Sequence, residues 1–223
     1  MLEVVLAAAL AVTGPQLEDV LAREQAGDDE GALKLADTLV HGYPNWVLPR
    51  LEAARLRLKK GEELGKAELD LEAAHSLAPE NPRVHFLQAL LFEEQGKPAA
   101  ERKSLELALT MRDTYTEARA KLAGLCFAQQ DFVCAEREYR ALCTVDSSIA
   151  IHLQLAATLD AQNKTADAET ELKSILAEQP DQPVAKRRLA DLYERTGRVD
   201  LANKLRGKPT EVRKLRPLKK SKH

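Results

Sequence analysis

The feature that most constrains this chain is a small residue that recurs about every 34 positions. It is found at Ala54, Ala89, Ala123, Ala156 and Ala190, in steps of 35, 34, 33 and 34 residues. A second series has the same period and consists of Ala32, Ala67, Ala135, Ala168 and Ala202, with Ala100-Glu101 at its remaining place. Self-similarity at a fixed period indicates a repeat architecture, in which each unit buries its apolar face against its neighbours.

Turn-forming residues and apolar pairs follow the same period. Seven residues after each alanine of the first series stand Gly61, Gly96, Gln130, Asn163 and Gly197, with Gly27 ahead of them. Apolar pairs spaced by three residues, such as Leu105 and Ala108, lie further along each unit and share one face of a helix. Ala and Leu dominate the apolar residues, beside abundant Glu, Lys and Arg, which favours helix throughout. We therefore predict an all-α chain of 12 to 14 helices in antiparallel pairs, with no sheet between residues 14 and 206.

These residues resemble the tetratricopeptide repeat family, from about Gly14 to Arg206. The chain departs from the family motif because the first-helix Trp is absent, Ala replaces the Gly beside the leucine, and the last unit lacks a full second helix. The resemblance implies about six degenerate repeats in an α-solenoid, with first helices lining the concave face. We expect a right-handed superhelical stack.

Two end segments flank the predicted solenoid of residues 14–206. Residues 1–13 contain the apolar run Val4–Val12, which is too short to span a bilayer and follows an acidic start. We expect a capping helix there, with a signal-like export segment as the alternative. Residues 207–223 carry seven Lys or Arg against one acid, a charge of +6, while the whole chain is −2. We interpret them as a basic, flexible tail with only weak, salt-sensitive affinity for nucleic acid.

The three cysteines, Cys126, Cys134 and Cys143, are odd in number and show no paired spacing. We expect them to be small buried hydrophobic residues in a reducing compartment. We therefore expect a cytoplasmic protein, with an exported one as the alternative.

If first helices line a groove, its residues lie one helical turn from the buried alanines. The candidate partner-binding residues are Leu51, Arg55, Leu58, Phe86, Leu90, Glu93, Phe127, Leu153, Asp160, Arg187, Asp191 and Glu194, with Ala120, Gly124 and Ala157 between them. Their apolar middle and charged end suit an amphipathic helix or an extended apolar segment. The alternative is a register shifted by one residue, which would place these side chains in the core.

No pattern of catalytic, metal or cofactor residues accompanies the repeats. The five histidines form no His-x-x-x-His pair, and the sequence has no Cys-x-x-Cys and no glycine-rich phosphate loop. The family's Lys and Asn clamp for carboxyl termini is also absent. We predict a non-enzymatic scaffold or assembly factor that binds a partner protein without a cofactor or a membrane span, its oligomeric state open. The alternatives are an exported pilotin-like assembly protein, or a nucleic-acid or membrane-surface adaptor that acts through the tail.

Overall fold

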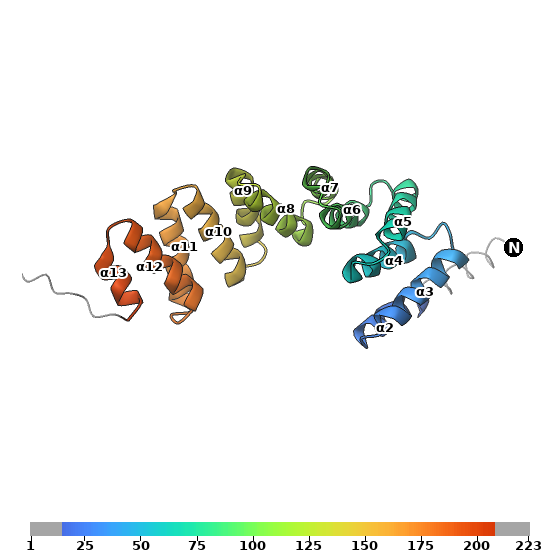
Figure 1. Cartoon of the computed structure of the whole chain (residues 1–223), viewed down its shortest axis with the longest axis horizontal. Helices are drawn as coiled ribbons and strands as arrows, with labels where there is room; N and C mark the ends of the chain where they lie inside the picture. The colour runs from blue at the N-terminus through green and yellow to red at the C-terminus, as the bar shows by residue number, and fades with distance from the viewer. Residues whose placement is uncertain (1–14, 208–223) are drawn as a thin grey trace, which may run out of the picture. The chain divides into compact units, whose positions relative to one another are not determined.

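The computed structural model describes residues 15–207, and every element in that range is an α-helix (Figure 1). The twelve helices are α2 (Pro15–Gln25), α3 (Asp29–Gly42), α4 (Val47–Lys60), α5 (Leu64–Leu77), α6 (Pro82–Glu94), α7 (Pro98–Met111), α8 (Thr116–Ala128), α9 (Phe132–Cys143), α10 (Ile149–Ala161), α11 (Thr165–Glu178), α12 (Pro183–Arg195) and α13 (Val199–Leu205). The predicted helix count and the absence of a sheet are confirmed for this range. The expected capping helix lies outside the described residues, as does the basic tail beyond Gly207.

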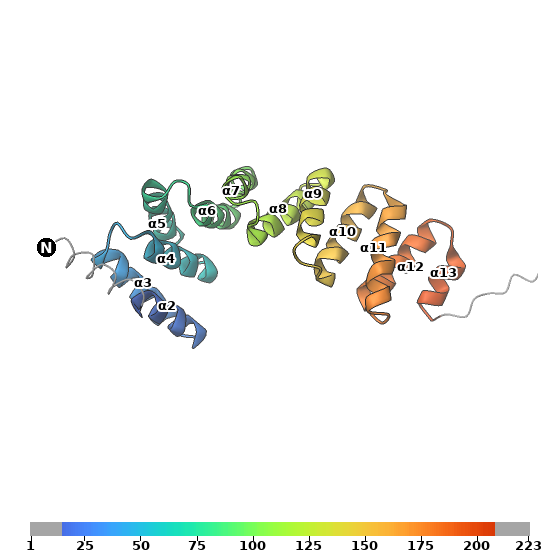
Figure 2. The ribbon, with the colours of Figure 1, turned by 180° about the vertical axis from the view of Figure 1, so that it is seen from behind.

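Successive helices fold back on one another in pairs, which Figure 1 shows from the front and Figure 2 from behind. Each pair turns at a residue with positive φ, and the values lie between 59° at Asn163 and 81° at Gly27. These turn residues are Gly27, Gly61, Gly96, Gln130, Asn163 and Gly197, as the sequence predicted. The following backbone N–H donates to a carbonyl five residues earlier, for example from Lys97 to Phe92 over 2.8 Å. This bond and the left-handed residue form the Schellman motif that ends a helix.

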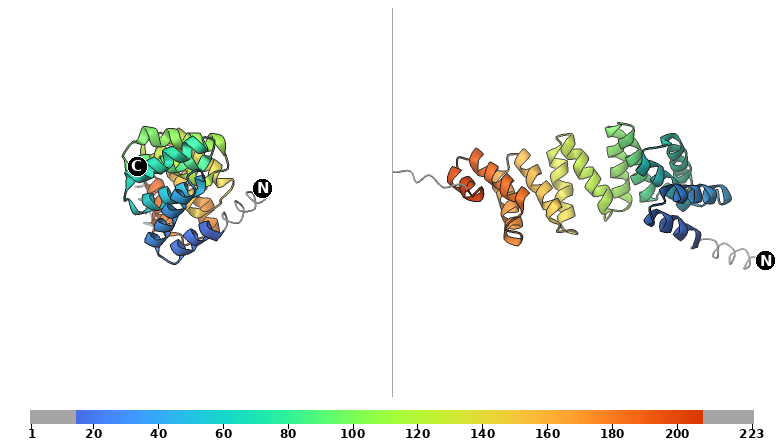
Figure 3. Two further views of the ribbon diagram at one scale, coloured as in Figure 1. Left: turned by 90° about the vertical axis from the view of Figure 1, so that its right-hand side faces the viewer. Right: turned by 60° about the horizontal axis from the view of Figure 1, so that its bottom comes forward.

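The chain divides into two compact units, Met1–Leu125 and Cys126–His223. Within each unit the helix pairs pack side by side, as the right-hand view in Figure 3 shows. The alanines of both series are buried, with at most 1% of their surface exposed. Alanine allows helix axes to approach to about 8–9 Å, so the period in the sequence marks the close helix crossings.

One position breaks the second alanine series. Glu101 takes the place that alanine holds in the other hairpins, and only 7% of its surface is exposed. Burial raises the pKa of its carboxyl group, and the nearby Glu93 carboxylate adds to that rise. A charge at a tight crossing is unfavourable, which identifies this crossing as a weak point of the first unit.

A buried arginine ties three helices of the first unit together. Arg57 on α4 is 3% exposed, and its guanidinium donates to Asp37 on α3 over 2.6 Å and to Asp70 on α5 over 2.8 Å. It also donates to Glu63 at the start of α5 over 3.2 Å. Burial raises the pKa of Asp70, although Arg57 and Arg50 oppose that rise. The position lies three residues after an alanine, where three other hairpins carry a large side chain, at Phe92, Leu159 and Tyr193.

The prediction of unpaired cysteines is wrong for two of the three residues, although both of these are buried as expected. Cys126 near the end of α8 and Cys134 in the first turn of α9 form a disulfide, with their Cα atoms 5.8 Å apart. Cys143 is the free cysteine and is half-buried. The hairpin bend brings the two helix ends together, and spacing along the chain does not reveal that proximity.

Candidate functional site

A hollow of about 180 Å³ lies between α4 and α6 in the first unit. Its lining residues are Arg55, Leu58, Lys59, Leu90, Glu93 and Glu94. Four of the six belong to the candidate groove residues, so the sequence placed them on a common surface. We refer to this surface as the α4–α6 hollow.

The floor of the α4–α6 hollow is apolar and its rim is charged. Leu58 is 8% exposed, and Leu90 is half-buried against the same core cluster. The rim has a basic side from α4, with Arg55 and Lys59, and an acidic side from α6. Such a surface fits an apolar side chain that is flanked by polar or charged neighbours.

Ion pairs hold the basic side of the rim in place. Arg55 donates to Glu24 on α2 over 2.5 and 2.9 Å and to Glu52 over 2.8 Å. Lys59 donates to Glu24 over 3.0 Å and to Asp29 over 2.9 Å. The hydrogen bond from Arg55 lowers the pKa of Glu24 to about 2, against the opposing effect of burial. These ion pairs therefore fix the positions of Arg55 and Lys59 on the basic side of the rim.

Two other candidates in the first unit lie deeper than expected. Leu51 has no exposed surface and belongs to the core, so its placement in a groove is corrected. The reason is that α4 packs against α3, α5 and α6, which cover most of its circumference. Phe86 is half-buried against the same core, and its ring centroid lies 5.1 Å from that of Tyr115. Each of these side chains therefore supports the packing of the chain itself.

A second hollow, of about 170 Å³, lies among α10, α11 and α12 in the second unit. Its lining residues are Ala156, Ala157, Asp160, Leu172, Arg188 and Leu192. Asp160, a candidate groove residue, accepts a hydrogen bond from Arg195 over 2.5 Å. Arg188 donates to the backbone oxygen of Leu153, another candidate, over 2.8 Å. This hollow is similar in volume to the α4–α6 hollow, and in both hollows charged lining residues are bonded within the chain itself.

The remaining candidates of the second unit are dispersed. Phe127 is half-buried, and its ring centroid lies 5.5 Å from that of Phe132 across the hairpin bend. Arg187 is exposed. Asp191 and Glu194 are exposed too, and both accept hydrogen bonds from Arg206, over 2.6 and 2.7 Å. The charged end predicted for the groove is thus partly neutralised within the chain.

Sequence reasoning missed Lys59 and Glu94 in the first hollow. They stand eight residues after Leu51 and Phe86, respectively. A helix face repeats at i, i+4, i+7 and i+8, so extending each candidate triplet by one position would have found both. In the second hollow Arg188 and Leu192 were missed, because the candidate triplet was placed one residue away from the face that lines it.

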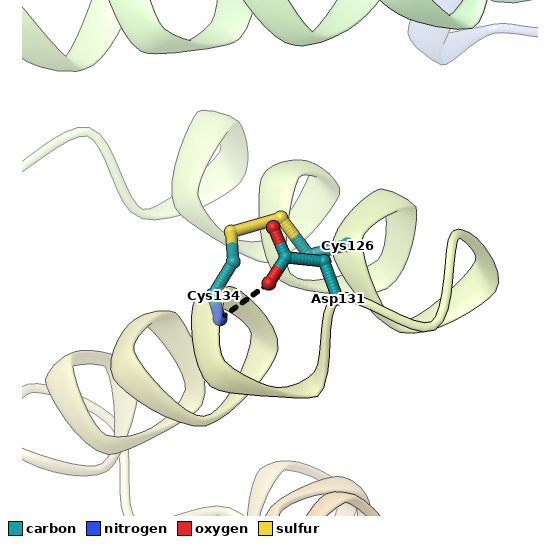
Figure 4. A group of neighbouring side chains, drawn as sticks. All are labelled: Cys126, Asp131 and Cys134. Atoms are coloured by element: carbon teal, nitrogen blue, oxygen red, sulfur yellow. Dashed lines mark hydrogen bonds between the residues drawn. A yellow bond between two sulfur atoms is a disulfide. The ribbon is translucent and has the colours of Figure 1, made fainter.

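One group of side chains in the described range has the spacing of a metal site. The ligand atoms of Cys126, Asp131 and Cys134 lie within 4.8 Å of one another (Figure 4). Both sulfur atoms are bonded to each other, and the Asp131 carboxylate caps α9 by accepting from the Cys134 N–H over 3.2 Å. The disulfide form offers no thiolate, and the carboxylate already has a structural role.

A Cys, His and Glu cluster in the second unit lacks the geometry of an activated nucleophile. The Cys143 sulfur lies 3.8 Å from Nδ1 of His152, and the Glu171 carboxylate lies 2.9 Å from the same nitrogen. One ring nitrogen cannot both receive a proton from the thiol and donate one to the carboxylate. Burial raises the pKa of Cys143, which disfavours the thiolate. Among residues 15–207, no helix has the length and apolar character needed to cross a bilayer.

Comparison with known proteins finds no matching family model and no matching curated protein. Solved structures do match. A tetratricopeptide repeat protein from Parabacteroides merdae superposes with a TM-score of 0.65 at 18% identity, over 85% of this chain and 75% of that one. The C-terminal part of a TPR repeat-containing protein from Cytophaga hutchinsonii gives 0.72 at 11% identity, over 85% and 76%. YrrB, a TPR protein with an unusual peptide-binding site, gives 0.60 at 18% identity, over 77% and 89%. The chain therefore has the fold of the tetratricopeptide-repeat proteins, an α-solenoid of paired helices.

Proposed function

We propose that this chain is a non-enzymatic interaction scaffold that binds a helical or extended segment of a partner protein through its first-helix surfaces. The α4–α6 hollow is the observation that carries this proposal. It joins four side chains that the sequence placed on one face, and it combines an apolar floor with a charged rim. Apolar hollows with a few convergent polar groups are the usual sites of side-chain recognition.

The size and charge of the hollow define the segment that would fit it. A cavity of about 150 Å³ can hold a benzene-sized group, so about 180 Å³ accommodates one leucine- or phenylalanine-sized side chain. Lys59 and Arg55 lie on one side of that anchor, and Glu93 and Glu94 on the other. Because Arg55 and Lys59 already pair with Glu24, and Glu93 pairs with Lys121, the apolar anchor of the partner would supply the main contact and the rim would flank it.

The structural neighbours support the same class of function. YrrB carries a peptide-binding site, and other matched structures are complexes, including Cut9 with Hcn1 and Naa15 with Naa10 and HypK. These are properties of those proteins. They support a scaffold here by analogy of fold.

A photo-cross-linking residue at Leu90 tests the proposal directly. We expect it to trap one defined partner segment, and the same group at Leu69, which is 66% exposed on α5, to trap none. A peptide of the trapped segment should then bind the purified chain. Leu90→Glu should weaken that binding by at least tenfold because it places a third acid beside Glu93 and Glu94, whereas the control Leu69→Glu should not. Equal binding by both variants would contradict the proposal.

The disulfide supports the exported alternative over the cytoplasmic expectation, because disulfides persist mainly in oxidising compartments. We propose that the scaffold works in such a compartment. Trapping thiols in intact cells at harvest, followed by counting labels, tests this. One labelled cysteine of the three would support an oxidising location, and three labelled cysteines would exclude it.

A further inference from the structure

The six hairpins share a pair of facing positions at the bend. The first position lies near the end of the first helix, and the second is the cap residue that begins the second helix. The pairs are Arg23 and Asp28, Arg57 and Glu63, Phe92 and Lys97, Cys126 and Asp131, Leu159 and Lys164, and Tyr193 and Arg198. We call the side-chain contact between such positions the hairpin clip.

Four hairpins have a non-covalent clip. Two are ion pairs, with N···O distances of 3.1 Å for Arg23 to Asp28 and 3.2 Å for Arg57 to Glu63. The other two are cations over aromatic rings. Lys97 lies 5.9 Å from the Phe92 ring centroid, and Arg198 lies 4.4 Å from that of Tyr193. The clip position therefore tolerates different chemistry as long as the side chain reaches the second helix.

The α8–α9 hairpin has a different clip. Cys126 is smaller than the phenylalanine, leucine or tyrosine of other hairpins, and the cap residue Asp131 turns back to bond the Cys134 N–H over 3.2 Å. Contact with the second helix is made by the disulfide to Cys134 (Figure 4). Cys126 is 0% exposed and Cys134 is 5% exposed. Without the bond, two small thiols would occupy a position that elsewhere holds a large side chain.

We propose that the Cys126–Cys134 disulfide is a redox-dependent clip that takes over, in this one hairpin, the role of the ion pair or cation–ring contact in four of the other five hairpins. A disulfide-bearing oxidant installs it by exchange. One thiolate attacks the oxidant, forms a mixed disulfide and releases one thiol; the second thiolate then displaces the other half as a second thiol. Two S–H bonds are lost, one S–S bond forms, and two electrons pass to the oxidant.

This proposal is independent of the partner-binding function. The clip joins residues of one hairpin in the second unit, whereas the α4–α6 hollow lies in the first unit. Cys143 takes no part in it, because this thiol contacts His152 instead. Reduction should therefore loosen the bend between α8 and α9 first, and amide hydrogen exchange should report that loosening at residues 130–134.

The test uses the full-length chain equilibrated with oxidised or reduced glutathione. Alkylation under denaturing conditions should label one of the three cysteines after oxidation and all three after reduction. Reduction should lower the melting temperature by about 5–10 °C, because the bond closes a short loop and the chain is of moderate length. Three labels after oxidation, or identical melting and exchange in both states, would overturn the proposal.

Three variants separate the clip from general destabilisation. Cys126→Leu with Cys134→Ala installs the residues that Leu159 and Ala100 provide in other hairpins, and its melting temperature should not respond to reductant. Cys126→Ser with Cys134→Ser should melt like the reduced wild type. Cys143→Ala should keep the full response. If reductant still lowers the melting temperature of the Cys126→Leu, Cys134→Ala variant, the disulfide clip is not the source of that change.

Discussion

Replacing Arg57 with methionine is the sharpest test of how the first unit is held together. The guanidinium is the common partner of Asp37, Asp70 and Glu63. Methionine retains an apolar stem of similar length and removes the charge and all the hydrogen bonds. The three carboxylates would then face one another without their shared cation.

The size of the effect follows from the exposure of the three carboxylates. Removing one partner of a fully buried pair costs about 3–5 kcal/mol. Asp37 and Glu63 are 35% and 42% exposed and can recover hydration, whereas Asp70 is 13% exposed and keeps only Arg50 at 3.3 Å. We therefore expect a loss of about 2–3 kcal/mol at pH 7. Because burial already raises the pKa of Asp70, and the loss of Arg57 raises it further, protonation should reduce the loss as the pH falls toward 4.

Urea unfolding followed by the fluorescence of Trp46 measures this effect in the right part of the chain. Trp46 is the only tryptophan and packs against the core cluster next to α3 and α4. Adding Asp70→Asn to Arg57→Met should restore at least half of the lost stability, since the neutral amide has no uncompensated charge. A loss below about 1 kcal/mol, or one that is equal at pH 7 and pH 4.5, would refute the reasoning.

Four further outcomes are expected. Gln130→Gly should raise the free energy of unfolding by about 0.5–1 kcal/mol, because glycine adopts the residue's φ of 61° without strain. Glu101→Gln should raise the melting temperature at pH 7 by a few degrees, with less gain near pH 4.5, because the raised pKa makes the ionised form the unfavourable one. The ionised Glu24 carboxylate should contribute about 1 kcal/mol to the free energy of unfolding after solvent screening, and this contribution should be lost as the pH falls from 4.5 toward 2, because the folded pKa of Glu24 is about 2. Glu24→Gln should abolish this part of the pH dependence. Phe86→Ala with Phe127→Ala should lower the melting temperature as well as partner binding, because both rings are half-buried; unchanged melting would show that they serve the partner alone.

The repeat architecture could be predicted because its two signals are strictly local. A close helix crossing needs a small residue, and a Schellman turn needs a residue that tolerates positive φ. Ala89 and Gly96 satisfy these needs in the third hairpin, and the same two requirements recur along the repeat. Gln130 met the prediction although it is not glycine, because its position in the period identified it.

The disulfide and the buried arginine could not be predicted in the same way. Cys126 and Cys134 lie on either side of a bend, and only the three-dimensional path of the hairpin makes them neighbours. Arg57 occupies a position where the period predicts an apolar side chain. Its burial depends on acids from two other helices, so no single-helix pattern reveals it. Arg57 and the disulfide each form the clip of their hairpin. The period therefore specifies where a clip lies in space and leaves its chemistry open.

The candidate site was predicted in part for a related reason. A helix that neighbours cover on three sides has few residues left for a partner, and α4 is such a helix. Leu51 therefore belongs to the core, whereas Leu58 and Leu90 line the hollow between α4 and α6. Sequence periodicity gives the angle of a residue around its helix, but the exposure at that angle depends on how many neighbours approach. Partner contact in the first unit should thus depend on the C-terminal turns of α4 and α6, rather than on the whole length of either helix.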